Sequence, residues 1–336
     1  MFKDYLRSDI MSSQESLIIL PKSDVIDTTQ RVENYQSIDT TNYYHRGSNL
    51  LKLLQDIGAV VFDTNNRLVL SAFFTNNEQK GSLSRILGYA AEGAVVRECN
   101  TNPSKNKIWA NYARKLKQDS NAFMQLFKSI YYEFFLENPD NYIAIGTGLA
   151  ITKTEYSHIY SHNSDRDICW VNKYNDAKQL LTVGGIKWNK QNFVGIQLKV
   201  STGINGYYVT NYFKKKPYYQ LYPVVYFDLG GDFYKVKDNL IYIDSQTVKP
   251  NTLFSNEVNY GDYSRAEIVD RMLIRGKDID PNLHDELLFY KHLLSQILAG
   301  KYSLYDLGNE DVLISLIIEY VGNNVSNSSP ILNISV

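Results

Sequence analysis

The stretch VGIQLKVSTG, residues 194–203, holds two polar residues whose spacing could support chemistry. Gln197 and Lys199 interrupt an otherwise strand-like run. Side chains alternate across a β-strand with period 2, so both point to one face of the predicted strand. One interpretation is a strand face exposed to solvent. The other is half of a metal-dependent catalytic site, in which the amide oxygen and the ammonium group act together.

Two carboxylates upstream could complete such a site. Glu92 lies in the middle of a predicted helix, within GYAAEGAVV, and Asp167 opens a predicted strand after SDR. Asp165 is a rival for the role of Asp167. A helix-face ion pair with Lys or Arg would also explain Glu92, and a turn or strand-edge carboxylate would explain Asp167.

Together these residues resemble the signature of the PD-(D/E)xK nuclease superfamily, which includes many restriction endonucleases and Holliday-junction resolvases. In that family an acidic residue opens the second strand, and (Glu/Gln/Asp)-x-Lys lies in the third. A glutamate on the first core helix often joins them within G-x-x-x-E. Here GYAAE supplies Gly88 and Glu92, SDRDICWV supplies Asp167, and IQLKV supplies Gln197 and Lys199. The resemblance covers roughly residues 82–229.

The resemblance implies a metal-dependent endonuclease that hydrolyses DNA phosphodiester bonds, of the restriction or phage-defence kind. Asp167, Glu92 and Gln197 would hold Mg²⁺, or Mn²⁺ in its place, because hard oxygen ligands suit these ions. Lys199 would orient or deprotonate the attacking water and steady the developing negative charge. We expect double-stranded DNA as the partner, and a homodimer, because symmetric cutting of a duplex usually needs two active sites.

The sequence also departs from the family pattern. The family more often has Glu where Gln197 stands, and no Pro precedes Asp167. Residues 174–191 would have to form an insertion or a long loop, and residues 107–139 a helical insertion. Two alternatives therefore stay open: an inactive nuclease-fold protein that binds nucleic acid or regulates, and a protein-interaction module.

A basic and aromatic run follows the Q-x-K strand. Lys214, Lys215 and Lys216 stand among aromatic residues in YYVTNYFKKKPYY. Lysines interleaved with aromatic rings suit phosphate contacts and base stacking, so these lysines are candidate nucleic-acid-binding residues. A solvated lysine face is the alternative.

Two other motifs carry less weight. His158 and His162, with Asp167, have the composition of a zinc site, but the segment lacks a convincing helix and a Cys partner, which favours a surface loop. Gly146 and Gly148, in IGTGLA, do not form a phosphate-binding loop, because no G-x-x-x-x-G-K-[ST] pattern follows.

The pattern of apolar residues predicts the elements that must position these side chains. Helices are expected where apolar residues recur at i, i+3, i+4 and i+7: a short helix around residues 50–54 that ends at Gly58, then 82–99, 107–139, 264–277, 281–299 and 309–324. Strands are expected at 59–63, 67–74, 141–152, 167–173, 192–201 and 221–229, with a hairpin over 232–244.

This order predicts a mixed α/β fold with a restriction-endonuclease-like α-β-β-β-α-β core. We expect N-terminal mixed elements over residues 1–81, the nuclease-like core with its helical insertion over 82–245, and a helical C-terminal region over 246–336. No internal repeat or low-complexity segment is apparent.

Composition excludes little beyond disorder and membrane insertion. The chain has 336 residues, 44% of them hydrophobic, and its 35 Lys and Arg against 36 Asp and Glu give a net charge of −1. Any binding of nucleic acid must then use a local basic patch. The N-terminus has no long apolar segment of the signal-peptide kind, and no run of about 18 apolar residues appears. Cys99 and Cys169 are expected to be small buried hydrophobes, and the protein is expected in the cytoplasm.

Overall fold

The computed structural model divides the chain into two units, Met1–Thr40 and Thr41–Val336. It describes residues 40–75, 79–116, 141–161, 166–174, 180–181, 194–203, 224–238 and 273–328. The described elements belong to the second unit, apart from the first residue of α3.

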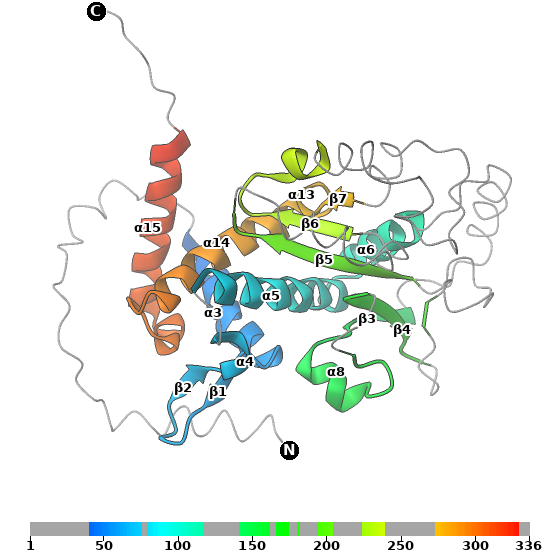
Figure 1. The fold of residues 1–336 in the computed structure, drawn as a ribbon, viewed down its shortest axis with the longest axis horizontal. Coiled ribbons are helices and arrows are strands. Elements are labelled where there is room, and N and C mark those ends of the chain that lie inside the picture. Colours follow the sequence, from blue (N-terminus) through cyan, green and yellow to red (C-terminus); the bar gives the residue numbers. More distant parts are fainter. Residues whose placement is uncertain are drawn as a thin grey trace, which may run out of the picture. The chain divides into compact units, whose positions relative to one another are not determined.

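A mixed five-stranded sheet organises the fold (Figure 1). Its strands, in spatial order, are β3 (Tyr142–Gly146), β4 (Ile168–Asn172), β5 (Gly195–Ser201), β6 (Val224–Asp228) and β7 (Leu273–Arg275). The first three pair antiparallel, whereas β5, β6 and β7 pair parallel. The predicted mixed α/β class is confirmed at this level. The strands predicted around residues 142–146, 168–172, 195–201 and 224–228 are confirmed as well.

Helices bury one face of this sheet. α5 (Gln79–Thr101) packs on β3 and β5, α6 (Pro103–Leu116) packs on α5 and β5, and α14 (Pro281–Leu298) packs on α5. The aromatic side chains of Trp109 on α6, Phe227 on β6 and His284 on α14 lie against one another at the centre. On the opposite face, a helical segment over residues 233–238 packs Phe233 and Val236 against β6 and β7.

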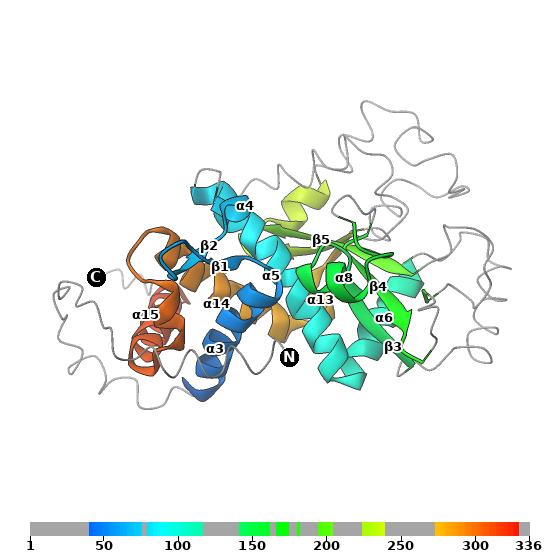
Figure 2. The same ribbon diagram turned by 90° about the horizontal axis from the view of Figure 1, so that it is seen from below.

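The elements at the two ends of the described chain complete the same core. α3 (Thr40–Asp56) runs into β1 (Val60–Phe62) and β2 (Leu68–Leu70), which form an antiparallel hairpin, and α4 (Ala72–Thr75) follows. Near the C-terminus come α13 (Gly276–Ile279), the 3-10 helix η7 (Leu304–Gly308) and α15 (Glu310–Ser328). Buried side chains from all three predicted regions share one hydrophobic cluster. Figures 1 and 2 place β3, β4 and α6 toward one end of α5 and α15 toward the other.

Three helix ends coincide with capping signals in the sequence. The first helix ends before Gly58, whose φ of +73° suits a glycine. Asp280 caps α14 by accepting a hydrogen bond from the Leu283 amide, and Pro281 occupies the first turn. α15 begins with Glu310 and Asp311, which favour the positive end of the helix dipole.

Four strand or helix expectations were wrong over part of their length. Residues 72–75 form α4 and residues 150–155 form the helix α8 (Ala150–Glu155), although both segments were expected to continue strands. Residues 233–238 are helical and not part of a hairpin. Residues 273–275 form β7, where a helix was expected, because Leu273 joins the parallel ladder beside Val224.

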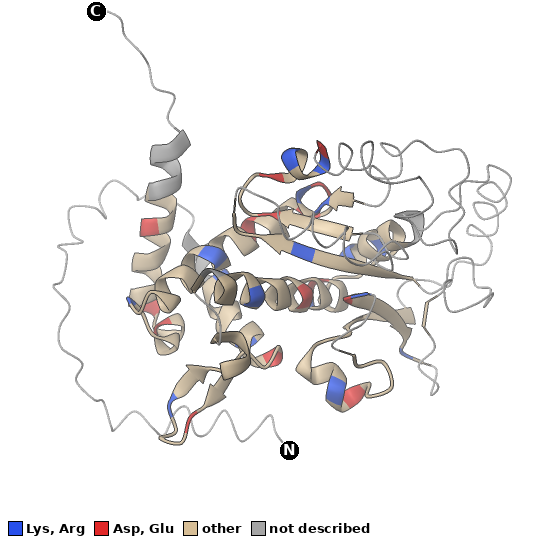
Figure 3. Cartoon of the chain, viewed as in Figure 1, with Lys and Arg blue, Asp and Glu red and all other residues tan. Residues whose placement is uncertain are grey.

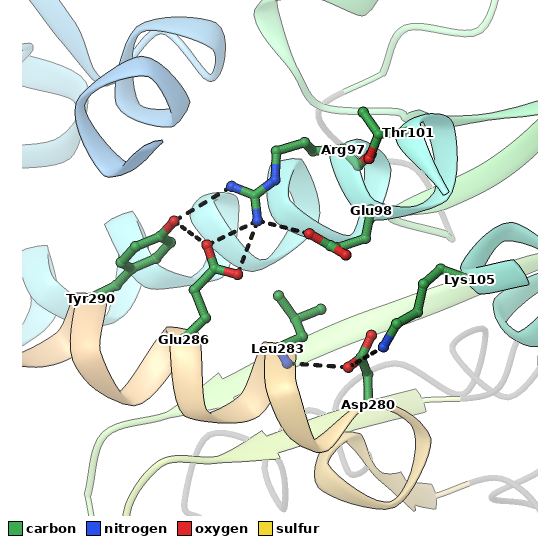
Figure 4. A network of polar contacts seen from close by, with 8 residues as sticks. All are labelled: Arg97, Glu98, Thr101, Lys105, Asp280, Leu283, Glu286 and Tyr290. Carbon is green, nitrogen blue, oxygen red and sulfur yellow. Dashed lines mark hydrogen bonds and ion pairs between the residues drawn. The ribbon is translucent and has the colours of Figure 1, made fainter. Parts of the chain in front are cut away.

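A network of polar side chains, which we call the Arg97 network, joins α5 to α14 (Figure 4). It consists of Arg97, Glu98, Glu286 and Tyr290. Arg97 Nη2 donates to both carboxylate oxygens of Glu286, at 2.9 and 3.0 Å, and to Glu98 Oε1 at 3.1 Å. The Tyr290 hydroxyl also donates to Glu286. The network holds the long helix α5 in a fixed position against α14.

Within the described ranges, no helix is both long enough and apolar enough to cross a membrane.

Candidate functional site: carboxylates, an amide and a lysine where the sheet divides

The sheet divides between β4 and β5, and the predicted site residues lie at that division. β4 and β5 pair only at Ile168–Ile196 and Cys169–Gly195, whereas β5 continues beside β6 as far as Ser201. Figure 1 shows β3 and β4 diverging from β5 and β6. A strand that loses its partner leaves backbone groups that side chains must satisfy.

Asp167 satisfies one of these groups and thereby fixes its own position. Its amide donates to Ile196 O at 2.8 Å, which is the last backbone bond between the two strands. Its carboxylate oxygen Oδ2 accepts from the Leu198 amide at 2.6 Å. The side chain therefore replaces the next backbone acceptor, and its carboxylate lies beside β5 at the point where Gln197 and Lys199 project.

Gln197 and Lys199 share one face of β5, as the alternation of a strand requires. Lys199 Nζ donates to Gln197 Oε1 at 3.1 Å and lies 3.5 Å from Asp167 Oδ2. The Gln197 side chain is buried, whereas the side chains of Lys199 and Asp167 are 24% and 27% exposed. The side chains of Lys199 and Asp167 are therefore partly accessible to solvent.

Glu92 joins these residues from the middle of α5. The residue is only 6% exposed, and its Oε1 accepts a hydrogen bond from the Gly148 amide at 3.1 Å. Burial raises the pKa of Glu92 well above its ordinary value, and the negative charge of Asp167 raises it further. The Gly148 hydrogen bond and the charge of Lys199 act in the opposite direction and do not cancel this effect.

We call Glu92, Asp167, Gln197 and Lys199 the fork site. Figure 3 shows that the strands are mostly uncharged, so the few charged positions on them stand out. The chain thus brings all four predicted residues together from α5, the residue before β4, and β5, which are far apart in the sequence. The interpretation of Gln197 and Lys199 as a strand face exposed to solvent does not fit Gln197, which is 1% exposed.

Gly146 makes room for the Glu92 carboxylate, and Gly148 lies in ordinary contact distance of it. A Cβ on Gly146 would stand 2.6 Å from Glu92 Oε1, closer than real Cβ atoms approach. A Cβ on Gly148 would lie 3.8 Å from both carboxylate oxygens and 3.6 Å from the Tyr89 ring. The segment IGTG lacks the pattern of a phosphate-binding loop, but its glycines lie next to the Glu92 carboxylate. A G-x-G pair at the end of a strand was a usable signal, because glycine marks places where other groups approach the backbone closely.

The donor set of the fork site suits a hard divalent cation. It offers two carboxylates and one amide oxygen, which are ligands that Mg²⁺ and Mn²⁺ accept. Among the described residues, no group of three or more His, Cys, Asp or Glu side chains is placed to hold a metal ion. An ion here would therefore depend on Gln197 as well as on Glu92 and Asp167.

Some predicted residues lie outside the described ranges. They are Lys214, Lys215 and Lys216, the rival carboxylate Asp165, and His162 of the alternative zinc site. Their roles stay predictions. Comparison of the chain with protein-family models, curated proteins and solved structures finds no match.

Proposed function

We propose that this protein is a Mg²⁺-dependent endonuclease that hydrolyses DNA, of the restriction or phage-defence kind. The observation that carries the proposal is the meeting of Glu92, Asp167, Gln197 and Lys199 at the division of the sheet. These residue types, from one helix and two strands, are those of the PD-(D/E)xK signature that the sequence resembles.

The strand arrangement supports the same proposal. The helix α5 precedes three antiparallel strands, and β6 then adds parallel to β5. This succession is compatible with the expected α-β-β-β-α-β order, with α6 inserted between α5 and β3 and α8 inserted between β3 and β4. The helix expected between β5 and β6 falls in residues 204–223, which lie outside the described ranges.

A cation would be held by Asp167, Glu92 and Gln197, and the buried Glu92 supports this assignment. Burial and the negative charge of Asp167 both destabilise the charged form of Glu92. A bound divalent cation would remove that penalty. When bound, such an ion supplies Lewis acidity and charge stabilisation at the scissile phosphate.

The remaining chemistry falls to the chain's own residues. Lys199 Nζ, partly exposed and beside Asp167, is placed to orient an attacking water and to stabilise negative charge that develops on the phosphate. Asp167 holds that ammonium group in place, and the Leu198 amide fixes the Asp167 carboxylate. Gln197 fixes the second side of the ammonium group through its amide oxygen.

A second candidate is a nuclease-fold protein that binds DNA without cutting it. The observation that favours it is Gln197, whose neutral amide takes the place of a carboxylate and bonds to Lys199. With one negative charge fewer, the site would hold a cation less tightly.

Cleavage of supercoiled plasmid tests the proposal. The wild type should nick or linearise the plasmid in Mg²⁺ and not in EDTA. Asp167→Ala and Lys199→Ala should each reduce the rate by about 100-fold or more, as loss of transition-state charge stabilisation does.

Asp63→Ala is the matched control. Asp63 also pairs with a basic residue, Arg67, and accepts backbone hydrogen bonds, but it lies on the β1–β2 hairpin. This variant should cleave like the wild type. Unchanged cleavage in both fork-site variants would overturn the site assignment. DNA binding that weakens with salt, without any cleavage, would favour the second candidate.

A further inference from the structure

The outer edge of β3 carries backbone groups that β4 does not use. β3 is the last strand of the described sheet. Asn141 O and the Thr147 amide bond across to β4 and the residues beside it, at Lys173 and Asp167. Because bonding residues alternate along an antiparallel strand, residues 142, 144 and 146 point their amide and carbonyl groups away from β4. An edge strand leaves such groups to water, to side chains or to another strand.

Two asparagines from the helices occupy this edge. Asn100, in the last turn of α5, bonds to Ala144 twice: its Nδ2 donates to Ala144 O at 2.9 Å, and its Oδ1 accepts from the Ala144 amide at 2.8 Å. Asn106, on α6, donates to Tyr142 O at 3.1 Å. The amide side chain of Asn100 therefore makes the pair of bonds that a residue of a neighbouring strand would make. This double bond ties the end of α5 to one residue of β3.

A second contact ties α5 to the same segment of chain, at Glu92. Glu92 Oε1 accepts from the Gly148 amide at 3.1 Å. Glu92 and Asn100 are eight residues apart on the helix, which is about 12 Å at 1.5 Å per residue. Ala144 and Gly148 are four residues apart, which is about 13 Å of extended chain. The two spacings agree, so both contacts form together when α5 runs antiparallel to β3 in one alignment.

The Glu92 contact alone is a weak tether. Among the described residues, the Gly148 amide is the one group that donates a hydrogen bond to Glu92. Burial and the charge of Asp167 both oppose a charged carboxylate at this place. A slide of α5 by one helical residue, about 1.5 Å, would be enough to break a hydrogen bond of this length. The position of the carboxylate therefore depends on what holds the helix along β3.

We propose that Asn100 is a positioning residue for the fork site. Its two bonds to Ala144 fix where α5 lies along β3, and thereby hold the Glu92 carboxylate beside Asp167, where a divalent cation would bind. Asn100 acts through Glu92 and touches neither the cation nor the substrate. The part of this inference that concerns the cation rests on the proposed function, whereas the part that concerns the position of Glu92 does not.

Hydrogen exchange of the Gly148 amide, measured in EDTA, tests the position of Glu92 without metal or catalysis. The protein would be labelled with ¹⁵N-glycine, and the Gly148 resonance identified by its loss in Gly148→Ala. Asn100→Ala should speed exchange at Gly148 by at least tenfold, because the Glu92 carboxylate no longer stays on that amide. Asn100 is exposed, so water can replace its lost bonds and the variant should fold.

Thr101→Ala is the matched control. Thr101 is the next residue of α5 and is also exposed, but its hydroxyl donates to Arg97 O within the helix and not to β3. This variant also loses one side-chain hydrogen bond at the end of α5. Its Gly148 amide should exchange at the wild-type rate, and a purely structural role of the helix end would give both variants the same rate.

The affinity for Mn²⁺, measured by electron paramagnetic resonance, tests the consequence for the cation. Groups that orient a metal ligand typically change metal affinity by 10- to 100-fold when they are removed. Asn100→Ala should therefore bind Mn²⁺ about 10- to 100-fold more weakly than the wild type, and Thr101→Ala should bind it equally well.

The outcomes separate this inference from the nuclease proposal. Equal exchange at Gly148 in Asn100→Ala and Thr101→Ala would overturn the inference, as would wild-type affinity of Asn100→Ala for Mn²⁺. Faster exchange in Asn100→Ala, with no Mn²⁺ binding by the wild type, would support the positioning of Glu92 and contradict only the metal-dependent function. Plasmid cleavage by the wild type with unchanged exchange in Asn100→Ala would do the reverse.

Discussion

The Arg97 network and the fork site both include residues of α5. A buried carboxylate is paired with a positive charge in the first and lies near a second carboxylate in the other. In the Arg97 network, both carboxylate oxygens of Glu286 accept hydrogen bonds from the Arg97 guanidinium group. Glu286 also accepts a hydrogen bond from the Tyr290 hydroxyl (Figure 4). In the fork site, Glu92 is buried beside a second carboxylate, and its charge is opposed by that neighbour. Glu92 and Arg97 are five residues apart in the sequence.

The difference indicates which group is built for stability and which for chemistry. A buried carboxylate such as that of Glu286, whose two oxygens both accept from one guanidinium nitrogen of Arg97, has its charge compensated within the protein. A buried carboxylate without a positively charged partner lowers the stability of the fold. Such carboxylates cluster at functional sites, where a ligand can interact with their charge. On this argument Glu286 fixes α14 against α5, whereas we propose that the charge of Glu92 serves to bind a cation.

The largest effect is expected from breaking the Arg97 network. Arg97→Met would leave Glu286 buried without its guanidinium partner, and should lower the free energy of unfolding by about 3 kcal/mol. Urea unfolding followed by circular dichroism would measure this. Arg67→Met removes the arginine of an exposed pair with Asp63 and should cause no measurable change. Equal stability of Arg97→Met and the wild type would show that the network is not structural.

A smaller effect is expected from crowding the fork site. Gly146→Ala would push a methyl group against Glu92 Oε1 and Leu149 Cδ1, at 2.6 and 2.5 Å. Relieving that overlap should cost about 2 kcal/mol of stability and move the carboxylate, so plasmid cleavage should also fall.

Gly308→Ala is the control for this change. No heavy atom of the described residues lies within 4 Å of its would-be Cβ, so both stability and cleavage should stay near wild type. If Gly146→Ala also matched the wild type in both assays, the close approach of Glu92 to this strand end would have no functional weight.

The smallest expected effect is a gain in stability, and it comes from neutralising Glu92. Because the folded-state pKa of Glu92 is raised, the unfolded chain loses this proton first as pH rises. The wild type should therefore lose stability from about pH 4.5, the ordinary pKa of the group, up to the raised folded value. Glu92→Gln lacks this loss, and should be more stable by about 1 kcal/mol at pH 8 in EDTA.

Thermal unfolding in EDTA at several pH values would measure this difference, which should vanish below pH 4.5. Glu286→Gln makes the same chemical change in the Arg97 network and should destabilise the protein, because Arg97 then keeps only the more exposed carboxylate of Glu98 as a charged partner. A destabilised Glu92→Gln would contradict the contrast between the two groups.

The sequence was a good guide where local physics decides the structure. Leu53, Leu54 and the glycine after them predicted a helix and its end, and Asp280 with Pro281 predicted the start of another. Strand alternation placed Gln197 and Lys199 on one face, whereas Glu92 and Asp167 were selected as a carboxylate within a helix and a carboxylate that opens a strand. Their approach to one another was implied only by the family resemblance, since it depends on how the strands pair.

The failures come from segments where two patterns compete. Tyr234, Lys235, Val236 and Lys237 alternate like a strand, but Phe233 and Val236 also have helical spacing, and burial of this pair against β6 decided the outcome. The strand predicted over residues 141–152 included Ile151, but β3 ends at Gly146. The glycines before it end the strand, and Thr152 Oγ1 then bonds back to Gly146 O at 2.5 Å within the turn to α8. Leu273 lies in a strand because it pairs with Val224 of β6, which is far away in the sequence.

The position of a bound metal ion tests the central claim most directly. Crystals grown with Mn²⁺, which scatters anomalously, would locate the ion in place of Mg²⁺. We predict one anomalous peak in contact with the carboxylate oxygens of Asp167 and Glu92, and its loss in Asp167→Asn. A peak elsewhere, or an Asp167→Asn variant that keeps the peak, would contradict the assignment of the fork site as a metal-dependent catalytic centre.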